Sequence, residues 1–292
     1  MEPHRLCPAC GERRARTLHR RPARRILRCT CGLVFIDPLP SEAEVAAREA
    51  EAFRGELLAE TRAMFDAYGR GYRDDDPVVR AFTRHLATLG RLAAGRRLLD
   101  VGVGTGLLVH LARQAGWDAT GVDICAEAAE RAGREFGVAV AVGDFLAVDL
   151  PGGYDAITMA DVVEHSRDPR AFLARAHALL APGGVLYVGV PNHRSLVYLA
   201  GDALGWLPGT GGLVDRLYVP NHYQYFTPQA LAALAREAGF TVAALEQENS
   251  YLGRYELSPV VRGGLAVLLA AGRAVGMESR LALFARRARE AG

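Results

Sequence analysis

Short apolar runs alternate with amphipathic segments through the middle of the chain, from about residue 95 to residue 250. Runs of this length that are rich in Val, Ile and Leu are typical of buried strands. A further run at 279–287 predicts a final strand that joins an edge of the sheet. The earlier predicted strands are residues 96–102, 118–124, 138–144, 154–161, 184–191 and 241–248.

Helices are predicted between these strands, because apolar residues there recur with a period close to that of an α-helix. Asp168 and Thr227 are expected to cap two of them, since a proline follows each in the first turn. The alternation of strands and helices predicts an α/β fold, a mostly parallel sheet with helices on both faces. The predicted helices are residues 105–116, 125–137, 168–184 and 227–240.

The segments outside this alternation divide the chain further. Residues 1–40 form a small module rich in Cys and Arg, and residues 41–94 form a helical linker or cap with Ser41 as its N-cap. The remaining domain spans residues 95–292. Within it we expect a lid-like insertion at 194–220 and a helical insertion at 255–278, before the last strand.

The composition is that of a globular protein and excludes several classes of enzyme. Of the 292 residues 50% are hydrophobic and 23% charged, and the net charge is +2, so no nucleic acid partner is expected. The chain contains no lysine, which P-loop proteins and pyridoxal enzymes need. Because it has neither an apolar signal core nor a run of about 18 uncharged apolar residues, we expect a cytoplasmic protein without a transmembrane segment.

Three glycines follow the first strand of the alternating region. A glycine-rich turn at the end of a strand is typical of a site where a nucleotide-like ligand lies against the backbone. The spacing here is Gly102-x-Gly104-x-Gly106, whereas dinucleotide-binding folds have G-x-G-x-x-G. The positions where that pattern needs its third glycine are Leu107 and Val109. The loop therefore disfavours NAD and FAD.

Carboxylates at the ends of the next two strands restrict the range of possible ligands further. Asp123 lies about 20 residues beyond the loop, where a carboxylate can accept both hydroxyl protons of a ribose. The following strand ends in Asp144, which can accept from an exocyclic amine, and Phe145, which can stack on a base. We therefore expect a ligand with a ribose, a planar base and no pyrophosphate.

These segments resemble, in order, the motifs of class I S-adenosylmethionine-dependent methyltransferases. The resemblance covers residues 95 to about 250 and implies a seven-stranded Rossmann-like sheet whose last strand is antiparallel. NHYQYFTPQALAALAREAGF is similar to the continuation that the family shows after its fifth strand. The other matching stretches are LLDVGVGTGLL, GVDI, VGDF, YDAITMADVVEH and LLAPGGVLYVGVPN.

The resemblance also implies a site for S-adenosylmethionine. The glycines let the methionine part approach the backbone, Asp100 lies near its ammonium group and Asp123 holds the ribose. Ile124 and Phe145 flank the adenine, and Asp144 contacts its amine, with ordinary core packing as the alternative for Ile124 and Phe145. The implied cofactor residues are Asp100, Gly102, Gly104, Gly106, Asp123, Ile124, Asp144, Phe145 and Ala160.

Two histidines are candidates for a catalytic base. Methyl transfer from a sulfonium is an in-line displacement, and a hydroxyl acceptor must also lose a proton, for which a histidine is suited near neutral pH. His165 follows the fourth strand and His222 follows the insertion, so both are expected to face the acceptor. The alternative is that they shape the pocket or cap a helix. Glu164 is interpreted as a structural or cofactor-side carboxylate.

The insertion at 194–220 is expected to cover the acceptor. Its apolar residues, with Trp206 at the centre, indicate a partly apolar or aromatic small molecule, and the glycines in 209–212 offer a hinge. The alternative is an insertion that only packs into the core.

We expect O-methylation in a natural-product, glycan or lipid-linked pathway, with N- or C-methylation or a non-catalytic binding protein as alternatives. The sequence ADVVEH lacks the N/D-P-P-Y/F tetrad of N6-adenine methylases.

Four cysteines near the start have nearly the spacing of a zinc ribbon. The first two form a C-x-x-C pair, whereas the last two form C-x-C, one residue short of a second knuckle. LRCTCGLVF resembles the strand that follows an N-terminal zinc ribbon in many methyltransferases. The short spacing leaves one later cysteine open, with His4 or His19 as a substitute, and a metal-free remnant or a redox pair as alternatives. The expected zinc ligands are Cys7, Cys10, Cys29 and Cys31.

Overall fold

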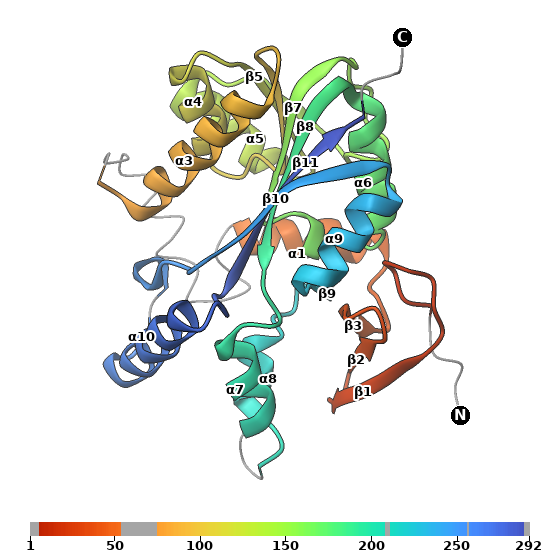
Figure 1. The fold of residues 1–292 in the computed structure, drawn as a ribbon, viewed down its shortest axis with the longest axis vertical. Helices are drawn as coiled ribbons and strands as arrows, with labels where there is room; N and C mark the ends of the chain where they lie inside the picture. The colour runs from red at the N-terminus through yellow and green to blue at the C-terminus, as the bar shows by residue number, and fades with distance from the viewer. Residues whose placement is uncertain (1–5, 54–74, 208–210, 256, 289–292) are drawn as a thin grey trace.

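A computed structural model describes residues 6–53, 75–207, 211–255 and 257–288. Its central sheet has the strand order β10-β11-β8-β7-β4-β5-β6, in which β8, β7, β4, β5 and β6 are parallel (Figure 1). This confirms the predicted seven-stranded, mostly parallel sheet. The strands are β4 (Arg97–Val101), β5 (Asp118–Asp123), β6 (Val140–Val142), β7 (Tyr154–Ala160), β8 (Leu180–Pro191), β10 (Phe240–Glu248) and β11 (Arg280–Arg287).

The last strand lies inside the sheet, so the prediction that it joins an edge is wrong. β11 runs antiparallel between β10 and β8 and pairs with both. The run from Leu281 to Ala285 is buried without interruption. Such a continuous apolar run suits a strand that is covered on both faces. The antiparallel direction of the last strand is confirmed.

Helices cover both faces of the sheet, as the alternation predicts. Successive residues of β8 point to opposite faces, and Tyr187 and Val188 belong to different core clusters. The Tyr187 side packs against α3 (Pro77–Leu92), α4 (Leu107–Gln114) and α5 (Ala126–Phe136). The Val188 side packs against α6 (Pro169–Leu179) and α9 (Pro228–Glu237), which lie on the right of Figure 1.

The predicted helix caps at Asp168 and Thr227 are confirmed. The Asp168 carboxylate accepts from the backbone N–H of Ala171 at 3.0 Å, and the Thr227 hydroxyl accepts from that of Ala230 at 3.2 Å. The end of α6 differs from the prediction, because the helix stops at Leu179 and β8 begins directly afterwards. Residues 181–184 belong to the strand, where the pairing with β7 shifts register.

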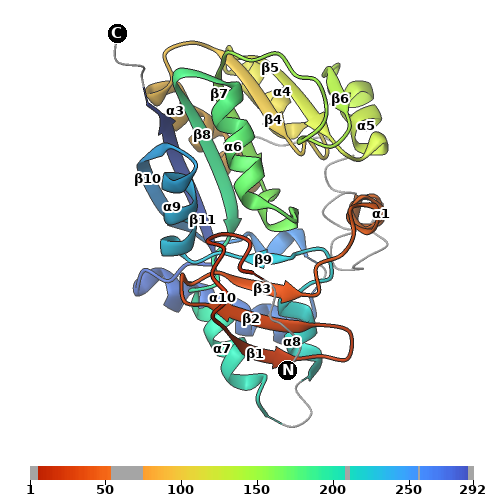
Figure 2. The ribbon, with the colours of Figure 1, turned by 90° about the vertical axis from the view of Figure 1, so that its right-hand side faces the viewer.

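A second, four-stranded antiparallel sheet is built mostly from the N-terminal module. It contains β1 (Ala15–Arg20), β2 (Arg25–Cys29) and β3 (Val34–Asp37), and its fourth strand is β9 (Gln224–Tyr225). Figure 2 shows β9 between β3 and the end of β8. The N-terminal module therefore completes its sheet with two residues from the far side of the insertion.

Helix α1 (Glu42–Phe53) follows the small sheet. The backbone N–H of Ser41 donates to the Glu44 carboxylate at 2.7 Å, and the N–H of Glu44 donates to the Ser41 hydroxyl at 3.3 Å. This reciprocal pair is a capping box, which confirms the predicted N-cap at Ser41.

The insertion forms α7 (Leu196–Leu204) and α8 (Gly211–Leu217), and α10 (Pro259–Ala274) packs beside α7. Tyr198 and Val214 of the insertion pack against Ile26 and Val34 of the small sheet. These helices form the lower part of the molecule in Figure 1. Within the ranges that the structure describes, no helix combines the length and apolarity needed to cross a bilayer.

Candidate active site

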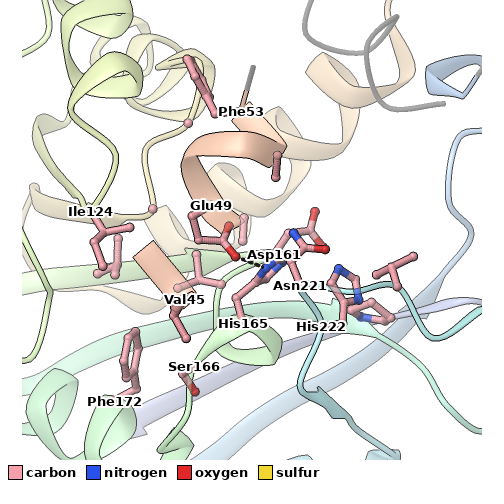
Figure 3. Close-up of a pocket in the computed structure, with 18 of the residues that line it drawn as sticks. Val45, Glu49, Phe53, Ile124, Asp161, His165, Ser166, Phe172, Asn221 and His222 are labelled. Atoms are coloured by element: carbon pink, nitrogen blue, oxygen red, sulfur yellow. Dashed lines mark hydrogen bonds and ion pairs between the residues drawn. The ribbon is translucent and has the colours of Figure 1, made fainter. Parts of the chain in front are cut away.

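A cavity of about 1250 Å³ lies at the carboxyl ends of β4, β5 and β7. Parallel sheets of this kind bind their ligands at that edge. The wall is completed by α1, by residues of the insertion and by one face of α10. Figure 3 shows that the side chains in it come from segments far apart in the sequence. The predicted residues that line it are Asp100, Gly102, Gly104, Asp123, Ile124, Asp144, Phe145, Ala160, His165 and His222.

The glycine loop turns sharply between β4 and α4. Gly102, Gly104 and Gly106 all have positive φ, which glycine adopts without strain. A Cβ on Gly106 would lie 2.8 Å from the Cβ of Ala132, so glycine lets α4 approach α5 closely. A Cβ on Gly104 would meet no atom within 4 Å. The backbone at Gly104 is therefore open to the cavity, whereas Gly106, which does not line it, serves packing.

Asp123 ends β5 with a carboxylate that the backbone holds in place. One oxygen accepts from the N–H of Gly104 and the other from that of Cys125, both at 2.8 Å. Burial raises the pKa of Asp123, although these two hydrogen bonds oppose the shift. Each oxygen keeps a free lone pair, so the group can still accept hydrogen bonds from a ligand.

Asp100 lies deeper, at the end of β4. Its carboxylate accepts from the Thr158 hydroxyl at 2.6 Å, and burial raises its pKa to about 8. A buried carboxylate with a raised pKa gains from a cation beside it.

The predicted adenine contacts differ in exposure. Ile124 is 37% exposed and lines the cavity, whereas Phe145 is almost fully buried and packs against Phe172 at a centroid distance of 5.4 Å. The Asp144 carboxylate accepts from the backbone N–H of Leu146 at 2.9 Å. Ile124 presents an open apolar surface, and Phe145 contributes both to the core and to the cavity wall.

His165 and His222 lie together in the cavity. His165 ends a short helix, η1 (Val163–His165), and its ring lies 4.6 Å from that of His222, centroid to centroid. The Nδ1 atom of His165 lies 2.9 Å from a carboxylate oxygen of Glu49 on α1, as the dashed line in Figure 3 shows. Sequence reasoning missed Glu49, which reaches the site only through the tertiary packing of α1.

Glu164 is fully buried beside the two histidines. Neither of its carboxylate oxygens has a hydrogen-bond partner among the described residues, and the same holds for Nδ1 of His222. One ligand-type atom from each of Glu164, His165 and His222 lies within 4.8 Å of the others. We call this trio the carboxylate–histidine cluster.

The pKa values of the three residues of this cluster are shifted in different directions. Burial disfavours the charged form of His165, yet the charge and hydrogen bond of Glu49 raise its pKa to about 9. Burial and the charge of His165 lower the pKa of His222 well below its ordinary value. Burial, followed by the charge of Asp161, raises the pKa of Glu164 to about 8. Asp161 itself pairs with Arg280 at 2.7 Å.

The far wall of the cavity is apolar. Leu213 and Leu217 of α8 and Leu265 and Leu269 of α10 line it. The predicted central place of Trp206 is wrong, because its side chain is 71% exposed, packs 5.7 Å from the His19 ring and does not line the cavity. The glycine hinge predicted at 209–212 lies partly outside the described residues, which omit 208–210.

The four N-terminal cysteines form a compact group that we call the cysteine cluster. The Sγ atoms of Cys7 and Cys31 lie 3.7 Å apart, and those of Cys10 and Cys29 lie 3.6 Å apart. Tetrahedral sulfur ligands around one zinc ion are separated by about 3.8 Å, given a Zn–S bond of about 2.3 Å. The geometry fits zinc with all four cysteines, in spite of the short C-x-C spacing.

His19, predicted as a substitute zinc ligand, does not belong to the cysteine cluster. Its Nε2 atom lies 2.9 Å from the Asp202 carboxylate of α7, outside the cysteine cluster. Asp202 also accepts from the Tyr218 hydroxyl, which lies 2.7 Å from Nε2 of the buried His193. These contacts join the module to the insertion. The other proposed substitute, His4, lies outside the described residues.

Comparisons with known proteins agree with this geometry. The sequence model of a family described as a methyltransferase domain matches residues 72–245. The ubiquinone biosynthesis O-methyltransferase of Methylococcus capsulatus is 30% identical over 176 residues, which cover 56% of this chain and 72% of the relative. The protein of the same name from Bordetella avium is 36% identical over 176 residues, which cover 56% of this chain and 70% of the relative.

Solved structures show a related fold at lower identity. The cyclase SpnF is similar with a TM-score of 0.55 and 20% identity, over 86% of this chain and 97% of that one. The 1,6-didemethyltoxoflavin-N1-methyltransferase of Burkholderia thailandensis, solved with S-adenosylhomocysteine, has a TM-score of 0.52 and 22% identity, over 92% of this chain and 98% of that one. Similarity at these identities establishes the fold alone.

Proposed function

Because the chain belongs to the methyltransferase-domain family and is an S-adenosylmethionine-dependent methyltransferase, we propose that it methylates an oxygen atom of a small, partly apolar molecule. The observation that carries this proposal is the lining of one cavity. The glycine loop and Asp123 lie in its wall together with His165, His222 and apolar side chains of α8 and α10. The relatives are named as O-methyltransferases of ubiquinone biosynthesis, which supports oxygen as the accepting atom.

We assign the cofactor to the part of the cavity at the glycine loop. S-adenosylmethionine supplies an electrophilic methyl carbon, which bonds to the acceptor oxygen as its bond to sulfur breaks with both electrons. Asp123 is held by the backbone and offers free lone pairs to the ribose hydroxyls. Asp100 offers the ammonium group a buried carboxylate, and a cation there favours its charged form. Ile124 offers an apolar surface to the adenine.

We assign the acceptor to the part of the cavity between the carboxylate–histidine cluster and the apolar wall. His165 and His222 face the acceptor oxygen and orient its hydroxyl, whose proton must leave as the new bond forms. The apolar body of the acceptor contacts Leu213, Leu217 and Leu265. Enclosure by these side chains keeps water away from the reacting atoms and aligns the acceptor.

We propose that the cysteine cluster binds one structural zinc ion. A module of this size has little core of its own and gains its fold from the metal. Its two Sγ–Sγ separations fit a tetrahedral site. Elemental analysis of purified protein should find about one zinc per chain that resists brief treatment with a chelator. A folded protein that never contained zinc would contradict this assignment.

Replacement of Asp123 tests the cofactor site. Asp123→Ala should weaken the binding of S-adenosylhomocysteine by about 1.5–3 kcal/mol, which is roughly 10- to 150-fold, because hydrogen bonds to a charged group are lost. Isothermal calorimetry measures this change. Asp149→Ala, which removes an exposed carboxylate outside the cavity, is the control. An unchanged dissociation constant in Asp123→Ala rules out the assignment of Asp123.

The accepting atom is tested with a panel of hydroxylated aromatic and aliphatic compounds. Mass spectrometry should detect addition of one methyl group, and NMR of the product should place it on oxygen. A methyl group on nitrogen or carbon would replace O-methylation with the corresponding transfer while leaving the cofactor assignment intact.

A further inference from the structure

We propose that Glu164, His165 and His222 bind one divalent metal ion at the acceptor end of the cavity, separate from the cysteine cluster. The three side chains present a carboxylate and two imidazoles with ligand atoms within 4.8 Å of one another. Ligands on opposite sides of one ion are separated by about 4.2 Å at most, given bonds of about 2.1 Å. Small side-chain rotations therefore suffice to close the trio on an ion.

The buried carboxylate of Glu164 is the first independent observation. Its side chain is fully buried, and neither oxygen has a hydrogen-bond partner among the described residues. Burial of an unpaired polar group destabilises the folded state, so native proteins pair such groups. A cation held between this carboxylate and the histidines would satisfy it. Nδ1 of His222, which is also buried without a partner in the described part of the chain, points to the same conclusion.

The contact of His165 with Glu49 is the second observation. Glu49 lies 2.9 Å from Nδ1 of His165, so this nitrogen donates to the carboxylate and leaves Nε2 as the ligand atom, from which a bound ion displaces the proton. Histidines that bind metals usually donate their other ring N–H to a carboxylate or carbonyl, which fixes the tautomer and the ring orientation. Glu49 supplies this outer contact from a different helix.

The donor set indicates the class of ion. Two imidazole nitrogens and one carboxylate oxygen suit first-row divalent ions such as Mn²⁺, Fe²⁺, Co²⁺ and Zn²⁺. Four thiolates, which are softer ligands, favour zinc. His165 and His222 line the cavity, so coordination positions remain open on that side. A bound ion acidifies a coordinated hydroxyl. This role in the reaction rests on the proposed O-methylation, whereas the binding of the ion does not.

Manganese alone is the probe that separates the two clusters. Mn²⁺ prefers oxygen and nitrogen ligands over thiolates, so a zinc-loaded cysteine cluster does not compete for it. The full-length protein should remove about one equivalent of Mn²⁺ from solution, measured by loss of the free-ion signal in electron paramagnetic resonance. Protein that leaves the signal of free Mn²⁺ unchanged, even at millimolar concentration, overturns the proposal.

Variants locate the site. Glu164→Gln and His222→Ala should weaken Mn²⁺ binding by more than about 100-fold, and Glu49→Gln by about 10- to 100-fold, the usual effect of an outer contact. His177→Ala, a histidine of α6 that does not line the cavity, should bind Mn²⁺ as the wild type does. Equal Mn²⁺ affinity in wild type, Glu164→Gln and His222→Ala places the ion elsewhere and overturns the proposal.

Cofactor binding keeps this test distinct from the test of function. Each variant is also titrated with S-adenosylhomocysteine, and affinity within about twofold of wild type shows that the fold is intact. Methyl transfer that continues at full rate without Mn²⁺ binding overturns the metal site and leaves the proposed function standing. Failure to bind S-adenosylhomocysteine, with Mn²⁺ bound, would overturn the function alone.

Discussion

The cysteine cluster and the carboxylate–histidine cluster are both groups of metal-ligand side chains, yet they are built in opposite ways. The first comes from two short loops, its atoms are already at the spacing of a tetrahedral site, and apolar residues such as Leu33 and Phe35 pack around it. The second joins η1 to a loop beyond the insertion, borders an open cavity and contains a buried carboxylate without a hydrogen-bond partner among the described residues.

This difference is the one that separates structural sites from reactive ones. A structural site has all its ligands from the protein, whereas a catalytic site keeps a position open for substrate. Unsatisfied buried polar groups reduce stability, so they persist where chemistry uses them. We therefore expect changes in the cysteine cluster to act on folding and changes around the cavity to act on reactivity.

The largest effect is expected for Cys7→Ser. Structural zinc sites contribute about 10–16 kcal/mol of apparent binding free energy, so loss of one thiolate should release the zinc and unfold the small sheet. Cys7 also borders the cavity, and turnover should fall with it. Elemental analysis and thermal unfolding measure both losses. Affinity for S-adenosylhomocysteine should persist, because the cofactor residues belong to the central sheet.

The matched control is Arg16→Ala, which changes an exposed residue of β1 outside the cysteine cluster. It should retain zinc and the wild-type melting temperature. If Cys7→Ser also retained both, the cysteine cluster would not be a structural site, and the contrast between the two clusters would fail.

A smaller effect, confined to reactivity, is expected for His222→Ala. Loss of a group that assists proton removal from a hydroxyl lowers kcat by about 10²–10⁴-fold. The affinity for S-adenosylhomocysteine should remain within about twofold, and the melting temperature should not fall. Steady-state kinetics on the true acceptor measures the change, with His177→Ala as the control. If His222→Ala and His165→Ala both kept the wild-type kcat, neither histidine would take part in transfer.

The last effect, which leaves turnover aside, concerns the pH dependence of stability. Burial raises the pKa of Asp100 from an ordinary 3.8 to about 8 in the folded protein. The contribution of the Asp100 carboxyl group to the free energy of unfolding is therefore fully present below pH 3.8. It is lost as the pH rises towards 8, since only the unfolded chain releases the proton in that window. Asp100→Asn should reduce this decline in the free energy of unfolding. Urea denaturation of ligand-free protein at pH 5 and pH 8 measures the decline. An identical decline in the wild type and in Asp100→Asn would contradict the raised pKa of Asp100.

The parts of the site that depend on local backbone geometry were predictable from the sequence. The glycine loop requires positive φ, and Asp123 ends the next strand at a fixed distance along the chain, so spacing alone indicates their places. The four cysteines and the cap at Ser41 are also short-range features. In each of these cases the partners are separated by a turn, by a single strand–helix unit or, between the two cysteine pairs, by the hairpin of β1 and β2, and the geometry of such short units varies little.

Features that depend on the packing of distant segments were not predictable in the same way. Glu49 is one of several acidic residues on α1, and no local signal marks it as the partner of His165. Trp206 is apolar, yet the sequence does not show which surfaces cover it, and it proves to be mostly exposed. The interior place of β11 likewise depends on pairing with strands far away in sequence.

The two-residue strand β9 has a consequence for the order of events during synthesis. All of β1, β2 and β3 are synthesised before residue 40, but Gln224 and Tyr225, which pair with β3, follow about 190 residues later. At roughly 5–20 residues per second, this interval lasts about 10–40 s. During that time one edge of the small sheet has no partner, and such an edge is prone to pair with other chains. Nascent molecules crowded on one messenger would therefore be most at risk of association through β3.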